Sequence, residues 1–345
     1  MELNSASGAP RSGRVTIKQV AQRAGVSTAS VSYVLSGRSG IAGRNGGVAS
    51  ETAVRIREAA EELGYAPDLA ARKIRTGRTE TILLSLTMLS DPWALAVIEA
   101  VQRRAMPLGI TPMILADADW ARVLKTHDAD AMFIDAVADG QQGELEALAR
   151  QGKKLVVFHE QIEPRGFEVI RSLAGPGCVL AMEHLLAKHQ KIAILTTERA
   201  RENRDPARFL PYLDGLRRAG LPLREEYLAT FDRSPVSAYA AAMRLLDRPD
   251  RPTAIYATTD FAAMSAINAA QRLGITVGED LDVVGVGNTL EGEAMAPSLT
   301  SVGPVGFFDE LARILVERAL GGSENSVTGG VVEFPWQLFI RDSAR

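Results

Sequence analysis

Four side chains within residues 28–33 are of types that could contact the edges of DNA bases. Thr28, Ser32 and Tyr33 carry hydroxyl groups, which donate or accept hydrogen bonds. The methyl group of Ala29 can pack on the methyl group of thymine. Such contacts require a helix that fits the major groove, so the chemistry depends on the elements that present these residues.

The surrounding residues 14–35, read as RVTIKQVAQRAGVSTASVSYVL, predict two short helices joined by a tight turn. Thr16 can cap the first helix, Gly25 permits the turn, and Ser27 can cap the second helix. The apolar residues of the second helix that should face a core are Val31, Val34 and Leu35. The segment is therefore a predicted helix-turn-helix, and Thr16 and Ser27 join the candidate DNA-binding residues.

A third helix is predicted from about Ser50, with Gly64 as its end. Its expected apolar members are Val54, Ile56, Ala60 and Leu63. The glycine-rich residues 38–48 precede it, and two interpretations of them stay open. They form a loop without a role, or Arg38 or Arg44 contacts a DNA phosphate.

Charge is unevenly distributed along the chain. Residues 1–79 contain twelve Lys and Arg against six Asp and Glu, a net charge of +6 in a chain of net charge −3, so the remainder carries −9. A basic segment attached to an acidic remainder suits a nucleic-acid-binding domain, although a solvated charged surface would give the same numbers of charged residues.

Composition excludes several classes of protein. The 345 residues are 46% hydrophobic and 23% charged, which is typical of a soluble globular protein of two or three domains. The single cysteine, Cys178, cannot form an intramolecular disulfide, so a stapled secreted fold is excluded. Residues 1–13 are small and polar, which predicts a disordered tail and not a signal peptide, and hence a cytoplasmic location.

From residue 80 onward, apolar runs alternate with helical patterns. This alternation predicts two parallel, doubly wound α/β sheets, each forming a lobe, with a cleft at the carboxyl ends of the strands. The expected lobe 1 spans about 80–173 and 303–330, and the expected lobe 2 about 174–300 and 333–345.

The order Val-Thr-Ile, Val-Ala, Ala-Gly-Val-Ser and Val-Ser within residues 15–32 resembles the N-terminus of the lactose/galactose/purine repressor (LacI-type) family. The runs EHLL at 183–186, PTAIYA at 252–257 and PSLTSV at 297–302 extend the resemblance over the rest of the chain. The resemblance implies a helix-turn-helix domain over 14–66, and an effector-binding and dimerisation domain over 80–345 that is similar to periplasmic binding proteins.

In that family, the segment between the two domains is a hinge that folds on operator DNA and wedges an aliphatic side chain into the minor groove. The matching segment here is 67–79, in which Ile74 stands at the wedge position and Arg72 adds positive charge beside it. A solvated linker is the alternative. The resemblance thus implies a homodimer that binds a pseudo-palindromic double-stranded operator and is most simply a repressor.

The effector site that the resemblance implies lies in the inter-lobe cleft. The residues that it assigns to a small-molecule effector are Asp91, Trp93, Glu160, Arg208, Asp260 and Asn288. Charged groups of this kind make bidentate hydrogen bonds to hydroxyl groups, and tryptophan offers a flat face for stacking. The resemblance implies no cofactor, no metal and no contact with a membrane.

Three departures from the family pattern bear on specificity. Tyr33 stands where arginine is common, so the usual bidentate contact with guanine is not available. Gly287 replaces an acidic residue, and Leu173 and Ala174 replace an Asp-Asn pair. A pocket without these groups pairs fewer hydroxyls, so three alternatives stay open: a sugar, a less polar metabolite, or no effector.

Two other classes of function fit the sequence less well than a DNA-binding regulator. A nucleotide-using α/β enzyme would need a phosphate-binding loop, and GVGNTLEG at 285–292 fails the glycine spacing of the dinucleotide fingerprint. The four histidines are scattered, so they predict neither a catalytic residue nor a metal site. A free solute-binding protein fits residues 80–345 but leaves the helix-turn-helix unexplained.

Overall fold

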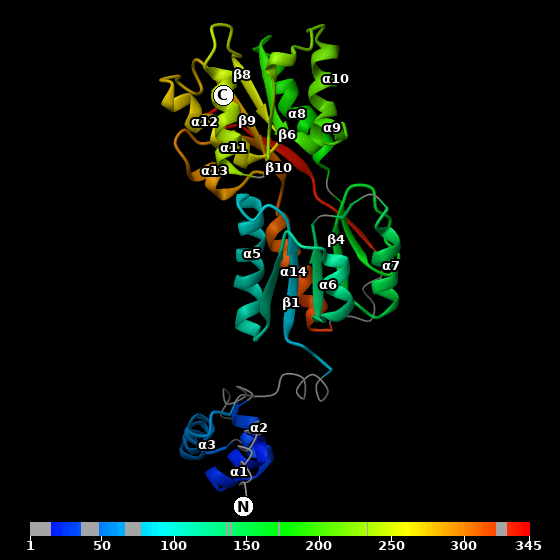
Figure 1. Ribbon diagram of the computed structural model, residues 1–345, viewed down its shortest axis with the longest axis vertical. Helices are drawn as coiled ribbons and strands as arrows, with labels where there is room; N and C mark the ends of the chain where they lie inside the picture. The colour runs from blue at the N-terminus through cyan, green and yellow to red at the C-terminus, as the bar shows by residue number, and fades with distance from the viewer. Residues whose placement is uncertain are drawn as a thin grey trace, which may run out of the picture. The chain divides into compact units, whose positions relative to one another are not determined.

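A computed structural model describes residues 15–35, 48–65, 77–135, 137–138, 140–171, 173–232, 234–321 and 330–345. The chain divides into two compact units, Met1–Thr79 and Glu80–Arg345 (Figure 1). We call the first unit the head and the second unit the body. No helix among the described residues is long and apolar enough to span a membrane.

The head contains three helices, α1 (Ile17–Ala24), α2 (Thr28–Leu35) and α3 (Ser50–Glu62). Gly25 ends α1 with a φ of 67°, in the left-handed region that glycine adopts without strain. The helices share one apolar core, made of Val20, Ala21, Ala24, Val31, Val34, Ala53, Ile56, Ala59 and Ala60. The predicted helix-turn-helix is therefore confirmed.

One core residue of the head was predicted wrongly. Val54 is 48% exposed, and Ala53 is buried in its place. Ala53, Ile56 and Ala60 recur at i, i+3 and i+7, so they share one face of α3, whereas Val54 lies about 100° away around the helix.

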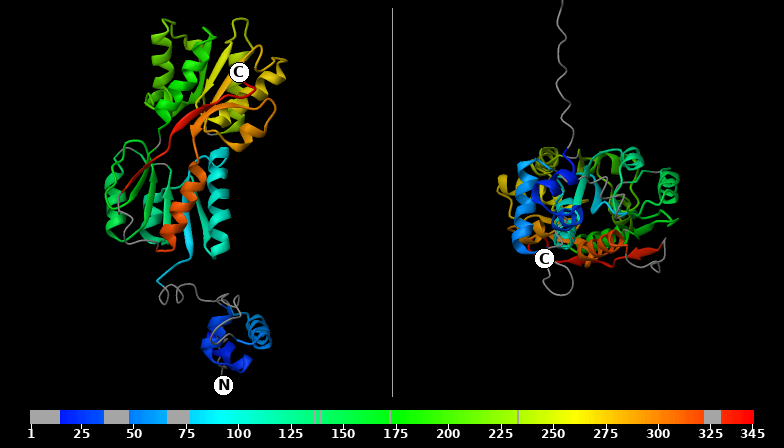
Figure 2. Two further views of the ribbon diagram at one scale, coloured as in Figure 1. Left: turned by 180° about the vertical axis from the view of Figure 1, so that it is seen from behind. Right: turned by 90° about the horizontal axis from the view of Figure 1, so that it is seen from below.

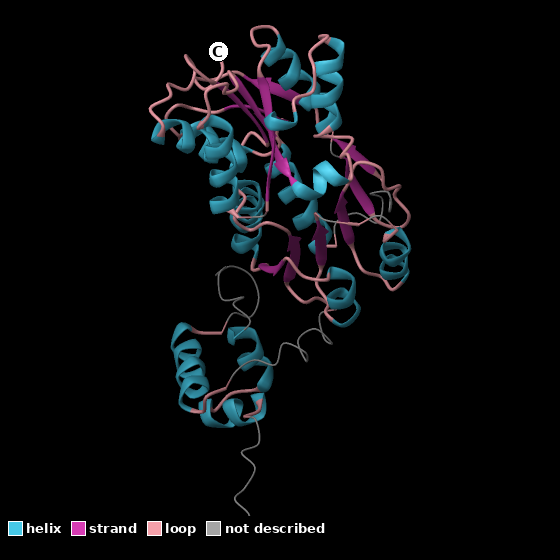
Figure 3. Cartoon of the chain, turned by 45° about the horizontal axis from the view of Figure 1, so that its top comes forward, coloured by secondary structure: helices cyan, strands magenta, loops and turns pink. Residues whose placement is uncertain are grey.

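Lobe 1 of the body is a six-stranded sheet in the order β11-β5-β4-β3-β1-β2, in which all pairs are parallel. Its strands are β1 (Thr81–Leu86), β2 (Thr111–Ala116), β3 (Ala131–Ile134), β4 (Leu155–Phe158), β5 (Glu168–Arg171) and β11 (Val331–Glu333). Helices α5 (Pro92–Ala105) and α14 (Phe307–Ala319) cover one face. Helices α6 (Trp120–Thr126) and α7 (Gln142–Arg150) cover the other face. Figure 3 shows the strands of the body flanked by helices.

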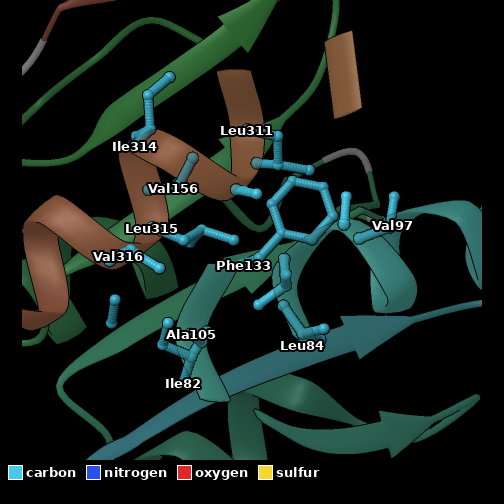
Figure 4. Packing of buried hydrophobic residues seen from close by; sticks show 14 of the residues in the cluster. Ile82, Leu84, Val97, Ala105, Phe133, Val156, Leu311, Ile314, Leu315 and Val316 are labelled. Carbon is cyan, nitrogen blue, oxygen red and sulfur yellow. The ribbon is translucent and has the colours of Figure 1, made fainter. Parts of the chain in front are cut away.

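The two faces of the lobe 1 sheet bury alternate residues of its central strands. Ile82 and Leu84 of β1 point toward this face, as do Phe133 of β3 and Val156 of β4 (Figure 4). Leu83, between the first two, faces α6 and α7 instead. Burial on both faces requires an almost continuous apolar strand, which is the pattern that predicted a parallel sheet.

Lobe 2 is a second six-stranded sheet, in the order β12-β10-β9-β8-β6-β7. Its strands are β6 (Ile192–Thr197), β7 (Leu228–Phe231), β8 (Ala254–Ala257), β9 (Asp282–Val286), β10 (Thr300–Pro304) and β12 (Trp336–Phe339). Helices α8 (Ala174–Leu186) and α10 (Leu210–Arg218) cover one face, and α11 (Pro235–Leu246) and α12 (Asp260–Arg272) the other. The shorter elements are η1 (Met106–Leu108), α9 (Glu198–Glu202), η2 (Glu225–Tyr227) and α13 (Leu290–Ala294).

The chain passes between the lobes three times, after β5, after β10 and after β11. The last two crossings are the orange and red segments seen from behind (Figure 2, left). The predicted α/β two-lobed fold is confirmed, with small corrections. Strand β10 runs to Pro304 within lobe 2, and β11 (331–333) pairs with β5 in lobe 1. Strand β11 leads directly into β12 without a helix that would reverse the direction of the chain. Strand β12 therefore runs antiparallel to β10.

Candidate DNA-binding surface and ligand cleft

Polar side chains satisfy free backbone groups at the start of both helices of the helix-turn-helix, that of Ser27 at α2 and that of Gln19 at α1. The Oγ of Ser27 accepts a hydrogen bond from the N–H of Ser30 at 3.1 Å, and so caps α2. The N–H and hydroxyl of Thr16 donate to Oε1 of Gln19 at 2.8 and 3.0 Å. These local bonds fix where each helix starts, which fixes the residues that α2 presents outward.

The predicted DNA-contact residues differ in their exposure. Thr28 and Ala29 are exposed at the start of α2, and Ser32 is half-buried one turn later. Tyr33 is also half-buried, and its ring packs against the head core, so it projects less freely than the sequence predicted. Four further candidates, Arg38, Arg44, Arg72 and Ile74, lie outside the described residues.

The body contains two adjoining cavities between its lobes. The inner cavity has a volume of about 180 Å³ and the outer cavity about 480 Å³. Lobe 1 lines the inner cavity with Thr87, Met88, Asp91, Trp93, Asp135 and Phe158. Lobe 2 and the crossing segments line it with Arg208, Thr259, Val286, Gly287, Pro304 and Trp336. Most of these residues follow the carboxyl ends of parallel strands, where open α/β sheets bind ligands.

Four of the six predicted effector residues line these cavities. Asp91 and Trp93 line the inner cavity, and Glu160 lines the outer one. Arg208 lines both, and its Nη1 donates to the carbonyl oxygen of Thr258 at 2.8 Å. The structure thus brings acidic groups of lobe 1 together with a guanidinium group of lobe 2.

Asp91 lies at the boundary between the lobes. Its Oδ1 accepts a hydrogen bond from the N–H of Trp93 at 3.0 Å and caps α5. Burial raises the pKa of Asp91 to about 6, against the effect of the Trp93 amide. The charges of Asp260 and Glu291 also raise this pKa, whereas that of Arg208 lowers it.

Asp260 and Asn288 line neither cavity, contrary to prediction. The buried carboxylate of Asp260 accepts from the N–H of Thr289 at 2.7 Å, from the hydroxyl of Thr289 at 3.0 Å and from the hydroxyl of Ser301. Burial raises its pKa, although these hydrogen bonds act in the opposite direction. Oδ1 of Asn288 accepts from Nη2 of Arg341 at 2.8 Å. Both residues therefore hold the loop after β9 in place.

Sequence reasoning missed several residues of the inner cavity, among them Asp135, Phe158 and Trp336. Asp135 directly follows β3, and Phe158 ends β4. Their position at strand ends was a usable signal, because every strand end of a parallel sheet points to the same edge. Trp336 begins the antiparallel β12, and no local pattern indicated that it would reach the cleft.

We expect Asp260→Asn to lower the free energy of unfolding of the body by about 2–3 kcal/mol, because an amide nitrogen would replace a buried oxygen that accepts hydrogen bonds. Denaturant unfolding followed by circular dichroism measures this change. Asp247→Asn, at an exposed position after α11, is the matched control and should change stability by less than about 0.5 kcal/mol. Equal stability of the two variants would show that the Asp260 hydrogen bonds contribute nothing.

Comparison with known proteins agrees with both units. Residues 16–68 match the model of bacterial regulatory proteins of the lacI family, and residues 182–344 match that of a periplasmic binding protein-like domain. The HTH-type transcriptional repressor PurR of Erwinia tasmaniensis is 31% identical over 307 residues, covering 83% of this chain and 84% of the relative. PurR of Pectobacterium carotovorum is 30% identical over 299 residues, with the same coverage.

Solved structures share the fold at lower identity. A transcriptional regulator of this family from Silicibacter pomeroyi aligns with a TM-score of 0.74 at 17% identity, covering 96% of this chain and 99% of that one. The lac repressor dimer bound to operator and the anti-inducer ONPF aligns with a TM-score of 0.67 at 23% identity, with the same coverage. These relatives are transcriptional regulators. With its helix-turn-helix head and two-lobed body, the chain belongs to the lacI family of bacterial regulatory proteins.

Proposed function

We propose that the protein is a homodimeric transcriptional repressor whose two heads bind a pseudo-palindromic operator and whose cleft binds a small-molecule effector. The observation that carries the proposal is the capped helix α2, which exposes Thr28 and Ala29 at its start, on a chain whose body encloses an inter-lobe cavity. The repressors among the relatives support the same reading.

In this proposal, α2 lies in the major groove of each half-site. Thr28, Ala29, Ser32 and the exposed part of Tyr33 contact base edges, and Thr16 and Ser27 lie at helix starts, where free N–H groups favour phosphate. Arg38 and Arg44 would bind phosphates. Arg72 and Ile74 would act at the minor groove, as their place in the family pattern implies.

An exposed apolar surface on lobe 1 supports the dimer. Its members are Leu95, Met106, Leu108, Met113 and Ile114, and each exposes between 44 and 63% of its area. They lie on α5, η1 and the edge strand β2. Several exposed apolar residues along one edge of a domain favour an interface there, and a two-fold axis lets a second copy cover them with the same residues.

The edge of β2 indicates how the second copy would pack. The N–H of Thr111 donates to the carbonyl oxygen of Glu80, in the direction of β1. Backbone N–H groups of successive residues face opposite edges of a strand, so the backbone nitrogen of Pro112 faces the open edge of β2. Proline has no N–H to donate, which disfavours the addition of another strand. We therefore expect the copies to pack through side chains and not through a continuous sheet.

Ile114→Lys is expected to convert the protein to a monomer at micromolar concentration, because burying a lysine at the centre of an apolar interface leaves its charge unpaired. Sedimentation velocity measures the change. Leu223→Lys is the matched control, since Leu223 is similarly exposed on lobe 2 and should leave the dimer intact. A dimeric Ile114→Lys variant would contradict this interface.

The effector would act by changing the angle between the lobes. The inner cavity is lined from both lobes, so a ligand that contacts both favours one inter-lobe angle over another. A differential affinity of a few kcal/mol between the two states is enough to switch operator binding. The direct effector contacts that we propose are Asp91, Trp93, Glu160 and Arg208, with Asp260 and Asn288 as positioning residues.

Selection of genomic DNA fragments by the purified full-length protein tests the proposed function. Moderate salt suppresses nonspecific phosphate binding, so only sequence-specific fragments are retained. A shared palindrome among the recovered fragments is the expected result, and the adjacent genes would indicate the class of effector. Retention of fragments without a shared site would contradict a sequence-specific dimeric repressor.

A further inference from the structure

Three aromatic rings line the inner cavity, Trp93, Phe158 and Trp336, and each is half-buried in the protein. The ring centroids of Trp93 and Phe158 are 5.4 Å apart, and both rings pack on the buried ring of Phe307, at 5.7 and 5.3 Å. This packing holds the two rings of lobe 1 in place. Rings fixed in this way offer flat faces and edges to a planar aromatic ligand.

Helix α8 holds the ring of Trp336 from the side of lobe 2. A Cβ atom at Gly177 of α8 would lie 2.5 Å from Cε3 of Trp336, so a glycine is needed for the ring to lie this close to the helix. Within the described residues, Trp336 makes no ring contact with Trp93 or Phe158. Each lobe therefore contributes its own fixed aromatic wall to the cavity.

The rest of the wall and the volume of the cavity suit a single ring. Val286, Gly287 and Pro304 of lobe 2 line the cavity and have no side-chain hydrogen-bonding group. The φ of Gly287 is 142°, a conformation that other residues rarely adopt, so this stretch of wall is bare backbone. An engineered apolar cavity of roughly 150 Å³ binds benzene. The inner cavity, at about 180 Å³, therefore has room for one six-membered ring with small substituents.

The inner cavity also presents a hydrogen-bond acceptor to a ligand. Asp91 lines this cavity, and its Oδ1 accepts from the N–H of Trp93 at 3.0 Å. Oδ2 of Asp91 accepts no hydrogen bond from any described residue. A hydroxyl group on the ring of a ligand can donate to this oxygen, and a hydrogen bond to a carboxylate is stronger than one between neutral groups.

Two guanidinium groups are available where the cavities adjoin and beyond. Arg208 lines both cavities, and its side chain donates to one described residue, from Nη1 to the carbonyl oxygen of Thr258 at 2.8 Å. Arg199 lines the outer cavity. Within the described part of the chain, neither arginine forms an ion pair. Guanidinium groups bind carboxylates through two parallel hydrogen bonds, so these two groups favour a ligand that carries a carboxylate.

The carboxylates that also line the outer cavity have other partners. Oδ1 of Asp205 accepts from the backbone N–H groups of Ala207 and Arg208, at 2.8 and 3.3 Å. Asp135 and Glu160 also interact with other groups of the protein. The two arginines are therefore left to pair with a group that a ligand brings.

We propose that the cleft binds a monocyclic phenolic acid whose ring lies among Trp93, Phe158 and Trp336. Its hydroxyl group donates to Oδ2 of Asp91, which lines only the inner cavity, and its carboxylate accepts from Arg208, which lines both cavities. The inference rests on the proposed function, since it assigns a chemical class to the effector.

Isothermal titration calorimetry of the full-length protein tests the proposal without DNA. The probes are 3-hydroxybenzoate and 4-hydroxybenzoate. Three matched compounds each remove one feature: benzoate lacks the hydroxyl group, the corresponding hydroxybenzamide lacks the charge, and 4-hydroxycyclohexanecarboxylate lacks the aromatic ring. A buffer of about pH 8 keeps Asp91 ionised, since its pKa is about 6.

We expect at least one hydroxybenzoate to bind with a submillimolar dissociation constant, about tenfold tighter than each matched compound. In Asp91→Asn the advantage of the hydroxybenzoate over benzoate should fall below about threefold, because an amide nitrogen replaces the accepting oxygen. The helix cap is kept, because asparagine caps as well as aspartate.

Arg208→Met should weaken binding of the hydroxybenzoate at least about tenfold and that of the hydroxybenzamide by less than about threefold, because only the former loses a charged partner. Arg244→Met, at an exposed position on α11, is the matched control and should bind both compounds like the parent protein. Thermal melting checks that each variant is folded.

Other results would overturn the proposal. These are failure of both hydroxybenzoates to bind at millimolar concentration, or binding of any matched compound as tight as that of the hydroxybenzoate. An advantage of the hydroxyl group that Asp91→Asn leaves unchanged would also overturn it. Operator binding is measured separately with DNA. A protein that binds a palindromic operator but no hydroxybenzoate would therefore refute the ligand class and leave the proposed repressor function standing.

Discussion

Ala29→Asp is expected to lower operator affinity by about 100-fold while the head stays folded. Ala29 is exposed and is the second residue of α2, so in the proposed complex its side chain meets the phosphate-lined major groove. A carboxylate there repels the phosphates and removes the methyl contact. The same carboxylate is favourable for the isolated helix, because acidic groups in the first turn interact well with the helix dipole. Fluorescence anisotropy on the selected operator, with thermal melting of the head, measures both effects.

The matched control is Val54→Asp, which adds the same charge at an exposed position on α3. It should change operator affinity by less than about threefold, since only the overall charge of the head is altered. If both variants lose affinity equally, general electrostatics and not the α2 surface would determine binding. If Ala29→Asp binds like the parent protein, α2 is not the element in the groove.

Ile74→Gly is expected to weaken operator binding by about 100-fold but nonspecific binding by less than about threefold. The expectation rests on the family pattern, because Ile74 lies outside the described residues. A wedge that opens a base step is needed only on kinked operator DNA, whereas nonspecific binding depends on phosphate contacts. Competition titrations at one salt concentration, with operator and with a scrambled duplex, measure the two affinities.

Ile74→Leu serves as the control, because it keeps an aliphatic side chain of the same volume and should retain most operator affinity. Equal losses on both duplexes in Ile74→Gly would remove the wedge from the mechanism. If Ile74→Leu loses as much operator affinity as Ile74→Gly, the shape of the side chain, and not apolar insertion alone, is required at this position.

Local sequence patterns predicted most helices and strands, because helix caps, turns and hydrophobic periodicity each depend on residues close together in the chain. The helix-turn-helix followed from the cap at Ser27, the turn at Gly25 and apolar residues at helical spacing. The central strands followed from uninterrupted apolar runs, which burial on both faces demands. Elements with weaker patterns were missed, such as β5 (Glu168–Arg171), which has charged ends, and the five-residue helices α9 and α13.

The ligand cleft was predictable only in part. The family pattern indicated Asp91, Trp93, Glu160 and Arg208, which line the cavities. The same reasoning placed Asp260 on the cavity wall, yet its oxygens hold Thr289 and Ser301. Whether a carboxylate after a strand points outward or inward depends on hydrogen-bond donors far away in the sequence, which a local pattern does not contain.

The sequence by itself determined the three-helix head and the two α/β lobes with their central parallel strands, because caps, turns and hydrophobic periodicity act over a few residues. The tertiary structure alone decided which side chains share the cavity. Trp336 reaches it by an antiparallel strand after the third crossing, and Asp135 and Phe158 meet Trp93 through the packing of neighbouring strands. These residues are distant in the chain, and only the closing of both sheets around the crossing segments brings their charges and rings together.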